Sequence, residues 1–212
     1  MVKTYILDFD GTMGDTRSLI VKTMQQTLAE LGLPKRTDDQ CAAMIGLPLK
    51  QTFTDLVPMD DSMGTLCDET YTRIFAENNV PGAVHVFPNV LDTIKELYDR
   101  GGIITIASSR HRPSLLNFID EMNLNKYISL VVSVSDVERS KPFPDMVYSI
   151  LEKTKCKSDD SIVVGDTIFD IEMGKSAGCL TCGVTYGNGT RLQLEQSHAD
   201  YIIDDFGELL NL

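Results

Sequence analysis

The sequence is short of basic residues, and this shortage argues against one large class of partners. Lysine and arginine total 19, against 31 aspartates and glutamates, so the formal net charge is −12. Proteins that bind nucleic acid carry a basic stripe that neutralises phosphates, and the nearest feature here is the short run Arg110-His111-Arg112. We therefore expect no nucleic-acid partner, and a small anion would need a local cation to bind.

Membrane-directing segments are also lacking. No apolar run is long enough to span a bilayer, and the N-terminal apolar run stops at Asp8 before it could serve as a signal peptide. The five cysteines are an odd number scattered along the chain, which suits a reducing compartment. We expect a cytoplasmic protein with no membrane partner, and the sequence leaves its oligomeric state open.

Zinc and redox motifs are sparse. Cys179 and Cys182 form a CxxC, but they lie in a strand-like apolar run, where side chains three apart point to opposite faces. No second cysteine pair or nearby histidine completes a zinc set, since His85, His111 and His198 lie far apart. The role of the cysteine pair stays open.

Apolar residues make up 42% of the chain, which is enough for a core, and their spacing alternates between strands and helices. This alternation indicates βαβ units and a parallel sheet. The expected strands are 4–9, 103–107, 128–134, 161–165, 180–184 and 199–203, and the expected helices between them are 90–100, 113–122, 144–153 and 169–177.

One region interrupts this alternation. A helical pattern covers 16–31, and further helical stretches fill 38–79, with breaks at Gly46-Leu47-Pro48 and at Pro58. The simplest interpretation is a Rossmann-like α/β core formed by residues 1–14 and 83–212, with an α-helical cap domain inserted at 15–82.

Ligands of open parallel sheets bind beyond the carboxyl ends of the strands. The polar residues expected there are Asp8, Asp10, Ser108, Ser109, Lys141, Asp166 and Asp170. Four carboxylates on one rim repel each other unless a cation lies among them. Because the set offers oxygen ligands and neither histidine nor cysteine, it favours Mg²⁺ over Zn²⁺.

Each motif alone has a simpler explanation. Asp-Phe-Asp-Gly-Thr at 8–12 could be a strand running into an Asp-Gly turn, and Asp166 or Thr167 could be a helix N-cap. Two aspartates at alternate positions, however, place both carboxylates on one face of a strand end, which is costly without a metal. We regard Arg110-His111-Arg112 as a solvated helix start, with a minor role open to Arg110.

Together and in this order, the motifs resemble those of the haloacid dehalogenase-like superfamily. The resemblance spans nearly the whole chain: Asp8-Phe-Asp-Gly-Thr12, Ser108 ending a strand, Lys141-Pro142, and Gly165-Asp-Thr-Ile-Phe-Asp170. The insertion after the first motif looks like the helical cap of the phosphoglycolate phosphatase and β-phosphoglucomutase subgroup.

The resemblance implies a Mg²⁺-dependent phosphatase that works through a phosphorylated aspartate. Asp8 would be the nucleophile and Asp10 the acid and base. Lys141, Ser108 and Ser109 would bind the phosphoryl group. Mg²⁺ would be held by Asp8, the carbonyl of Asp10, and Asp166, with Asp170 acting indirectly.

The resemblance leaves the substrate open among phosphoglycolate, sugar phosphates, nucleotides and pyrophosphate. A phosphohexose mutase shares the core residues, but Leu49 lies near where a mutase cap often has an arginine. Asp10 disfavours a dehalogenase or a phosphonate-cleaving enzyme, and a non-catalytic metabolite-binding regulator would be expected to have lost one of the core residues. Lys50 is the cap cation best placed to contact a small phosphorylated substrate.

Overall fold

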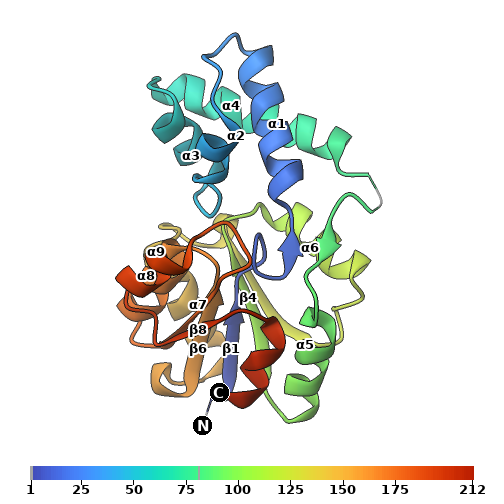
Figure 1. Ribbon diagram of the computed structural model, residues 1–212, viewed down its shortest axis with the longest axis vertical. Helices are drawn as coiled ribbons and strands as arrows, with labels where there is room; N and C mark the ends of the chain where they lie inside the picture. The colour runs from blue at the N-terminus through green and yellow to red at the C-terminus, as the bar shows by residue number, and fades with distance from the viewer. Residues whose placement is uncertain (1, 81) are drawn as a thin grey trace.

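The computed structural model describes residues 2–80 and 82–212 and places a six-stranded parallel sheet at the centre of one lobe (Figure 1). Its strand order is β5-β4-β1-β6-β7-β8. The strands are β1 (Thr4–Leu7), β4 (Ile103–Ser108), β5 (Ile128–Ser133), β6 (Ser161–Gly165), β7 (Leu180–Val184) and β8 (Tyr201–Ile203). Because β1 is central, the loop after β1 lies at the middle of the carboxyl edge of the sheet.

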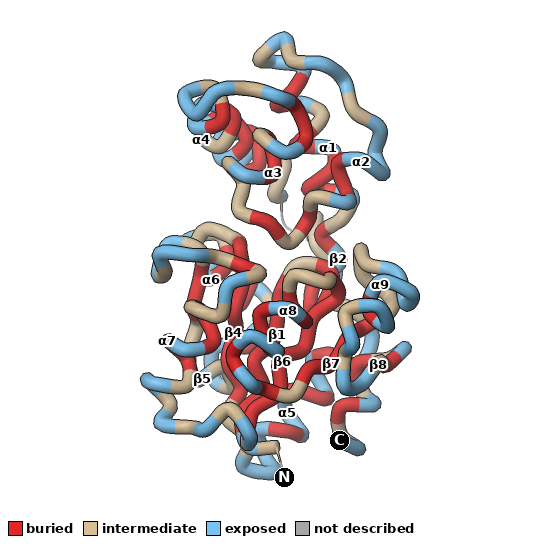
Figure 2. Tube along the Cα trace, turned by 90° about the vertical axis from the view of Figure 1, so that its left-hand side faces the viewer, coloured by how far each residue is buried: buried red, intermediate tan, exposed pale blue. Residues whose placement is uncertain are grey.

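Helices cover both faces of this sheet, and alternation along β1 assigns them. Leu7 packs in the apolar cluster that contains residues of α5 and α6, whereas Ile6 packs with residues of α7 and α8. Both faces of the strands are therefore buried (Figure 2). The helices of this lobe are α5 (Val90–Asp99), α6 (Arg112–Glu121), α7 (Asp145–Thr154), α8 (Ile168–Ser176), α9 (Arg191–Gln196) and the 3₁₀ helices η1 (Val134–Asp136), η2 (Ser158–Asp160) and η3 (Phe206–Asn211).

Four helices form a second lobe beyond the carboxyl edge of the sheet (Figure 1). They are α1 (Arg17–Glu30), α2 (Asp38–Ala42), α3 (Leu49–Leu56) and α4 (Asp61–Asn78). Side-chain caps start two of them: Thr37 and Gln40 form a capping box on α2, and Asp60 accepts from the backbone N–H of Met63 on α4.

A short ribbon joins the lobes. Strand β2 (Gly14–Asp15) leads into the helical lobe, and strand β3 (His85–Val86) leads out of it. The two strands pair antiparallel, and the backbone N–H of Phe87 adds a bond of 3.0 Å to the carbonyl of Met13. The two crossings are thus held together beside the loop after β1.

The predicted fold class, a parallel α/β sheet with inserted helices, is confirmed. The strands of the ribbon were not predicted because two-residue strands leave no periodicity to detect. Helix α9 was also missed, although Thr190 and Gln193 carry the spacing of a capping box and form one. In the part of the chain described, no helix is both long and apolar enough to cross a membrane.

Candidate active site

The loop after β1 carries the first two candidate residues. The backbone N–H of Asp8 still bonds to the carbonyl of Val164 in β6, at 2.9 Å, so the position of Asp8 is set by the sheet. The chain then turns at Gly11, where φ is +85°. A β-carbon at this position would lie 2.2 Å from Oδ2 of Asp166, so glycine is required for the loop to pass this carboxylate.

Lys141 is buried between two carboxylates. Its ammonium forms an ion pair with Asp8 and a second with Oδ1 of Asp170, at 2.7 Å. Burial lowers the pKa of Lys141, but the charges of Asp170 and Asp8 outweigh burial and leave the pKa raised. The lysine is therefore a fixed cation at the end of β1, the local positive charge that an acidic protein needs to hold an anion.

Asp8, Asp166 and Asp170 form a compact acidic cluster. Each offers an oxygen atom within 4.8 Å of the others, and all three side chains are buried. Burial and the neighbouring charge of Asp170 raise the pKa of Asp166 to about 7, and burial also raises the pKa of Asp8 well above its ordinary value. One ammonium against three carboxylates leaves negative charge in excess, so the oxygen donors fit a divalent cation such as Mg²⁺.

Hydrogen bonds orient two members of this acidic cluster. Oδ2 of Asp170 accepts from the backbone and hydroxyl of Thr167, at 3.1 and 2.8 Å. Oδ2 of Asp166 accepts from the backbone and side-chain nitrogens of Asn188, at 2.6 and 3.0 Å. Asn188 was not predicted from the sequence; its one detectable signal is its place after the end of β7, the strand next to β6 in the sheet.

Two serines lie at the end of β4, and the structure separates their contacts. Ser108 is buried and accepts a hydrogen bond from the backbone N–H of Arg110, at 3.3 Å. Ser109 donates its hydroxyl to the carbonyl of Gly46, at 2.6 Å, in the connection between α2 and α3. Ser109 thus links the sheet lobe to the helical lobe, and both serines line the same cavity as Asp8.

Arg110 corrects the interpretation of Arg110-His111-Arg112 as a solvated helix start. Its side chain is only 7% exposed and forms a two-pronged ion pair with Asp10, with Nε 3.1 Å from Oδ2 and Nη2 2.5 Å from Oδ1. The guanidinium also lies 4.7 Å from the ring centre of Phe75 in α4 and 5.0 Å from that of Phe118 in α6. The partners of Arg110 come from distant parts of the chain, so the local sequence did not reveal them.

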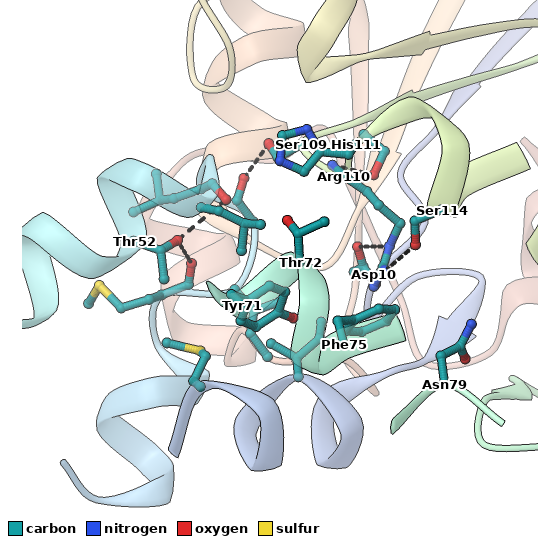
Figure 3. A pocket seen from close by; sticks show the side chains of 18 of the residues that line it. Asp10, Thr52, Tyr71, Thr72, Phe75, Asn79, Ser109, Arg110, His111 and Ser114 are labelled. Atoms are coloured by element: carbon teal, nitrogen blue, oxygen red, sulfur yellow. Dashed lines mark hydrogen bonds and ion pairs between the residues drawn. The ribbon is translucent and has the colours of Figure 1, made fainter. Parts of the chain in front are cut away.

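A cavity of 420 Å³ lies between the two lobes (Figure 3). Asp8, Asp10, Ser108, Ser109 and Arg110 line it from the sheet lobe, and side chains of α1, α3 and α4 line it from the helical lobe. Pockets for small ligands typically hold about 300–1,000 Å³. The acidic end of this cavity therefore has room for a small anion, and the helical end for the group attached to it.

Comparisons with known proteins identify the family. The family described as "Haloacid dehalogenase-like hydrolase" matches residues 5–184. The chain belongs to this family. A protein from Dickeya dadantii named "Probable phosphatase IndB" is 32% identical over 97% of this chain and 90% of its own length. A protein from Anoxybacillus flavithermus named "Pyrophosphatase PpaX" is 28% identical over 100% of this chain and 96% of its own length.

Solved structures agree with this assignment. A crystal structure from Bacteroides fragilis, described as haloacid dehalogenase-like hydrolase, is 26% identical and superposes with a TM-score of 0.93, over 99% of this chain and 100% of that one. The prediction of a haloacid dehalogenase-like phosphatase is confirmed by these relatives.

Lys50, the cation predicted to contact the substrate, lies in the first turn of α3 next to Leu49 and pairs with α4. Its ammonium lies 2.6 Å from Asp61, and it does not belong to the side chains that line the cavity. Its neighbour Leu49 does line the cavity. Arg110, just before α6, is the cation that lines the cavity among the described residues. Its neighbour His111 also lines the cavity, and Nε2 of His111 lies 3.0 Å from Asp68 of α4.

Proposed function

We propose that the protein is a Mg²⁺-dependent phosphomonoester hydrolase in which Asp8 forms an aspartyl-phosphate intermediate. The observation that carries this proposal is the buried ion pair between Lys141 and Asp8 at the acidic end of the cavity. A carboxylate that attacks a phosphate dianion meets a like charge, and a fixed ammonium beside it lowers that repulsion. Asp8 lines the cavity together with two serines, and the fully buried Lys141 lies behind it with one N–H left beyond those that pair with Asp8 and Asp170.

In the proposed first step, Asp8 attacks phosphorus and the bond to the leaving oxygen breaks. Lys141 and the Ser108 hydroxyl bind the phosphoryl oxygens, while Asp10 gives a proton to the leaving alcohol. In the second step Asp10 takes a proton from a water molecule, which attacks the phosphorus and frees Asp8. Arg110 holds the Asp10 carboxylate on the cavity wall through both prongs of their ion pair.

Asp8, Asp166 and the carbonyl of Asp10 would hold Mg²⁺. Asp170 would orient the site from behind, because its Oδ1 pairs with Lys141 at 2.7 Å and its Oδ2 accepts twice from Thr167, whereas Oδ1 of Asp166 accepts only a longer bond of 3.3 Å from Thr12 among the described residues. Bound Mg²⁺ would supply charge neutralisation for the carboxylates and the phosphoryl oxygens. Asn188 would keep the Asp166 carboxylate turned toward this position.

We propose that residues 15–82 act as a cap that covers the cavity and selects the substrate. The side chains that this region turns toward the cavity favour hydrolysis over transfer of a phosphoryl group between two positions of a phosphohexose. A mutase must hold a second phosphate, and the cap residue that lines the cavity beside Lys50 is the apolar Leu49.

Release of inorganic phosphate from a panel of phosphomonoesters, with Mg²⁺ and with excess chelator, tests this function. We expect release that depends on Mg²⁺ from at least one ester. Folded protein that releases no phosphate from any of them would overturn the hydrolase and favour a mutase or a binding protein. Ser62→Ala, at an exposed residue that does not line the cavity, serves as the unaffected control.

Mg²⁺ should stabilise the protein more at pH 8 than at pH 6. Burial raises the pKa of Asp166 from 3.8 to about 7. In the metal-free protein, ionisation of Asp166 therefore opposes folding, and the stability that is present below pH 4 is lost as the pH rises through 7. Metal binding needs the ionised carboxylate and so reverses this loss. At a Mg²⁺ concentration about 100 times Kd, we expect the unfolding temperature to rise by about 5–10 °C at pH 8 and by less at pH 6.

Thermal unfolding of Asp166→Asn in the same buffers provides the matched control, because this variant should lose most of the Mg²⁺ effect. Asp39→Asn, at an exposed residue of α2, should keep it. A Mg²⁺ effect of equal size at both pH values would contradict the assignment of Asp166 as a metal ligand.

A further inference from the structure

The helical end of the cavity is walled by apolar side chains. Ile20 and Met24 come from α1, Leu49 from α3, and Tyr71 and Phe75 from α4. Met44, Ile45, Leu47 and Ala76 complete this surface, which we call the apolar wall. A substrate whose phosphate lies beside Asp8 would place its leaving group against the apolar wall. The wall favours hydrocarbon, since transfer of a charged group to it would forfeit hydration without a partner.

Four polar side chains around the apolar wall already hydrogen-bond to the protein. The hydroxyl of Thr52 donates to the carbonyl of Leu47, that of Thr72 to Asp68 and the amide of Asn117 to Glu121, at 3.4, 3.4 and 2.7 Å, and Ser114 accepts from Arg110 at 2.9 Å. A sugar would need several donors and acceptors in this position, and part of the capacity of these four side chains is taken by the protein. The Tyr71 hydroxyl and the Asn79 amide remain for a polar atom or two, and both are uncharged (Figure 3).

The two basic side chains of the cavity are also engaged. Arg110 uses Nε and Nη2 on Asp10 and Nη1 on Ser114, and His111 is hydrogen-bonded to Asp68. A second anionic group on the substrate would have to share either side chain with a carboxylate that already pairs with it, and in the case of Asp10 that carboxylate is nearly buried. No other lysine, arginine or histidine among the lining residues that the structure describes offers an alternative.

Resting on the phosphatase function proposed above, we propose that the substrate is a phosphomonoester of an uncharged, mainly apolar alcohol. The apolar wall would bind the hydrocarbon part, and Asp8, Lys141 and Ser108 the phosphate. Pyrophosphate, after which some relatives are named, and phosphoglycolate both carry a second anionic group and fit this cavity less well.

Phosphate release from ethyl, butyl and hexyl phosphate tests the proposal. The three alcohols have nearly the same acidity, so their esters differ in hydrocarbon length and hardly in intrinsic reactivity. Each methylene buried against the apolar wall should raise kcat/KM about fourfold, until the cavity is filled. Hexyl phosphate should also be hydrolysed faster than pyrophosphate and phosphoglycolate at the same concentration of Mg²⁺.

Two leucine variants locate the effect. Leu49→Lys puts a cation in the apolar wall and should lower kcat/KM for hexyl phosphate at least about tenfold while sparing or raising that for phosphoglycolate. Leu66→Lys makes the same change on the exposed side of α4, outside the cavity, and should change neither.

The outcomes separate the two proposals. A rise with chain length that Leu49→Lys abolishes and Leu66→Lys preserves supports the apolar alcohol. Mg²⁺-dependent hydrolysis that is fastest for pyrophosphate or phosphoglycolate, or that ignores chain length, overturns the apolar alcohol and leaves the phosphatase standing. Absence of hydrolysis from every ester overturns both.

Discussion

Replacement of Asp8 by asparagine is expected to lower kcat by about 10⁴-fold or more while the protein stays folded. The amide has nearly the shape of the carboxylate but cannot attack phosphorus. Burial raises the pKa of Asp8 well above its ordinary value; Lys141 opposes this shift and Asp170 adds to it. Ionisation of Asp8 therefore opposes folding, and the neutral amide should leave the protein folded. Lys141 keeps Asp170 as a partner, at 2.7 Å. Phosphate release and thermal unfolding measure the two effects.

Asp15→Asn is the matched control, since Asp15 is exposed in strand β2, just beyond the same loop, and should tolerate the change with normal turnover. The wild-type enzyme, quenched in acid during turnover, should also carry a phosphoryl group on the peptide that contains Asp8, and mass spectrometry detects it. Near-normal activity of Asp8→Asn, or a phosphoryl group on another residue, would remove Asp8 from the role of nucleophile.

The sheet and its acidic edge could be predicted from the sequence because their signals are local. Each buried strand is an apolar run, and each candidate core residue comes after the end of a strand or in its loop. The parallel sheet then brings these ends to one edge, which is why Asp8, Lys141, Asp166 and Asp170 lie together although the chain between them is long. The order of the strands therefore predicts that these residues are close in space, although they are far apart in the sequence.

The partners of the surrounding side chains could not be predicted in the same way. Arg110 pairs with Asp10, 100 positions earlier, and its ring contacts come from both lobes. Locally, Arg110-His111-Arg112 has the composition of a solvated helix start, and Arg112 is indeed 42% exposed. Arg110 is buried and Arg112 is exposed because of how the two lobes pack against each other, and no local sequence pattern encodes that packing.

The helical lobe carries the weakest sequence signal of the molecule. Its helices are recognisable, but which of their side chains face the cavity depends on how the four helices are tilted and rotated. Lys50 and Leu49 are neighbours, and the rotation of α3 turns the leucine toward the cavity and the lysine toward Asp61. A shift of one position along α3 therefore decides whether this part of the helical lobe presents a cation or hydrocarbon to the cavity.

Replacement of Asp10 by asparagine should lower kcat/KM for alkyl phosphates by about 10²–10⁴-fold, the usual contribution of a general acid. The loss should be much smaller for p-nitrophenyl phosphate, because p-nitrophenolate leaves without a proton. Water attack on the phosphorylated Asp8 would still lack its base. A rapid-mixing experiment should therefore show a burst of p-nitrophenol, followed by slow turnover, while the phosphoenzyme accumulates.

Stability provides the second readout for Asp10→Asn. The variant leaves the nearly buried guanidinium of Arg110 without its carboxylate, and loss of one partner of a buried pair costs about 3–5 kcal/mol. Adding Arg110→Met removes the orphaned charge and should recover most of the unfolding temperature but none of the activity on alkyl phosphates. If the double variant recovered both, the low activity of Asp10→Asn would come from a disturbed fold. An equal loss for alkyl and p-nitrophenyl esters, without a burst, would likewise exclude Asp10 as the group that moves the proton.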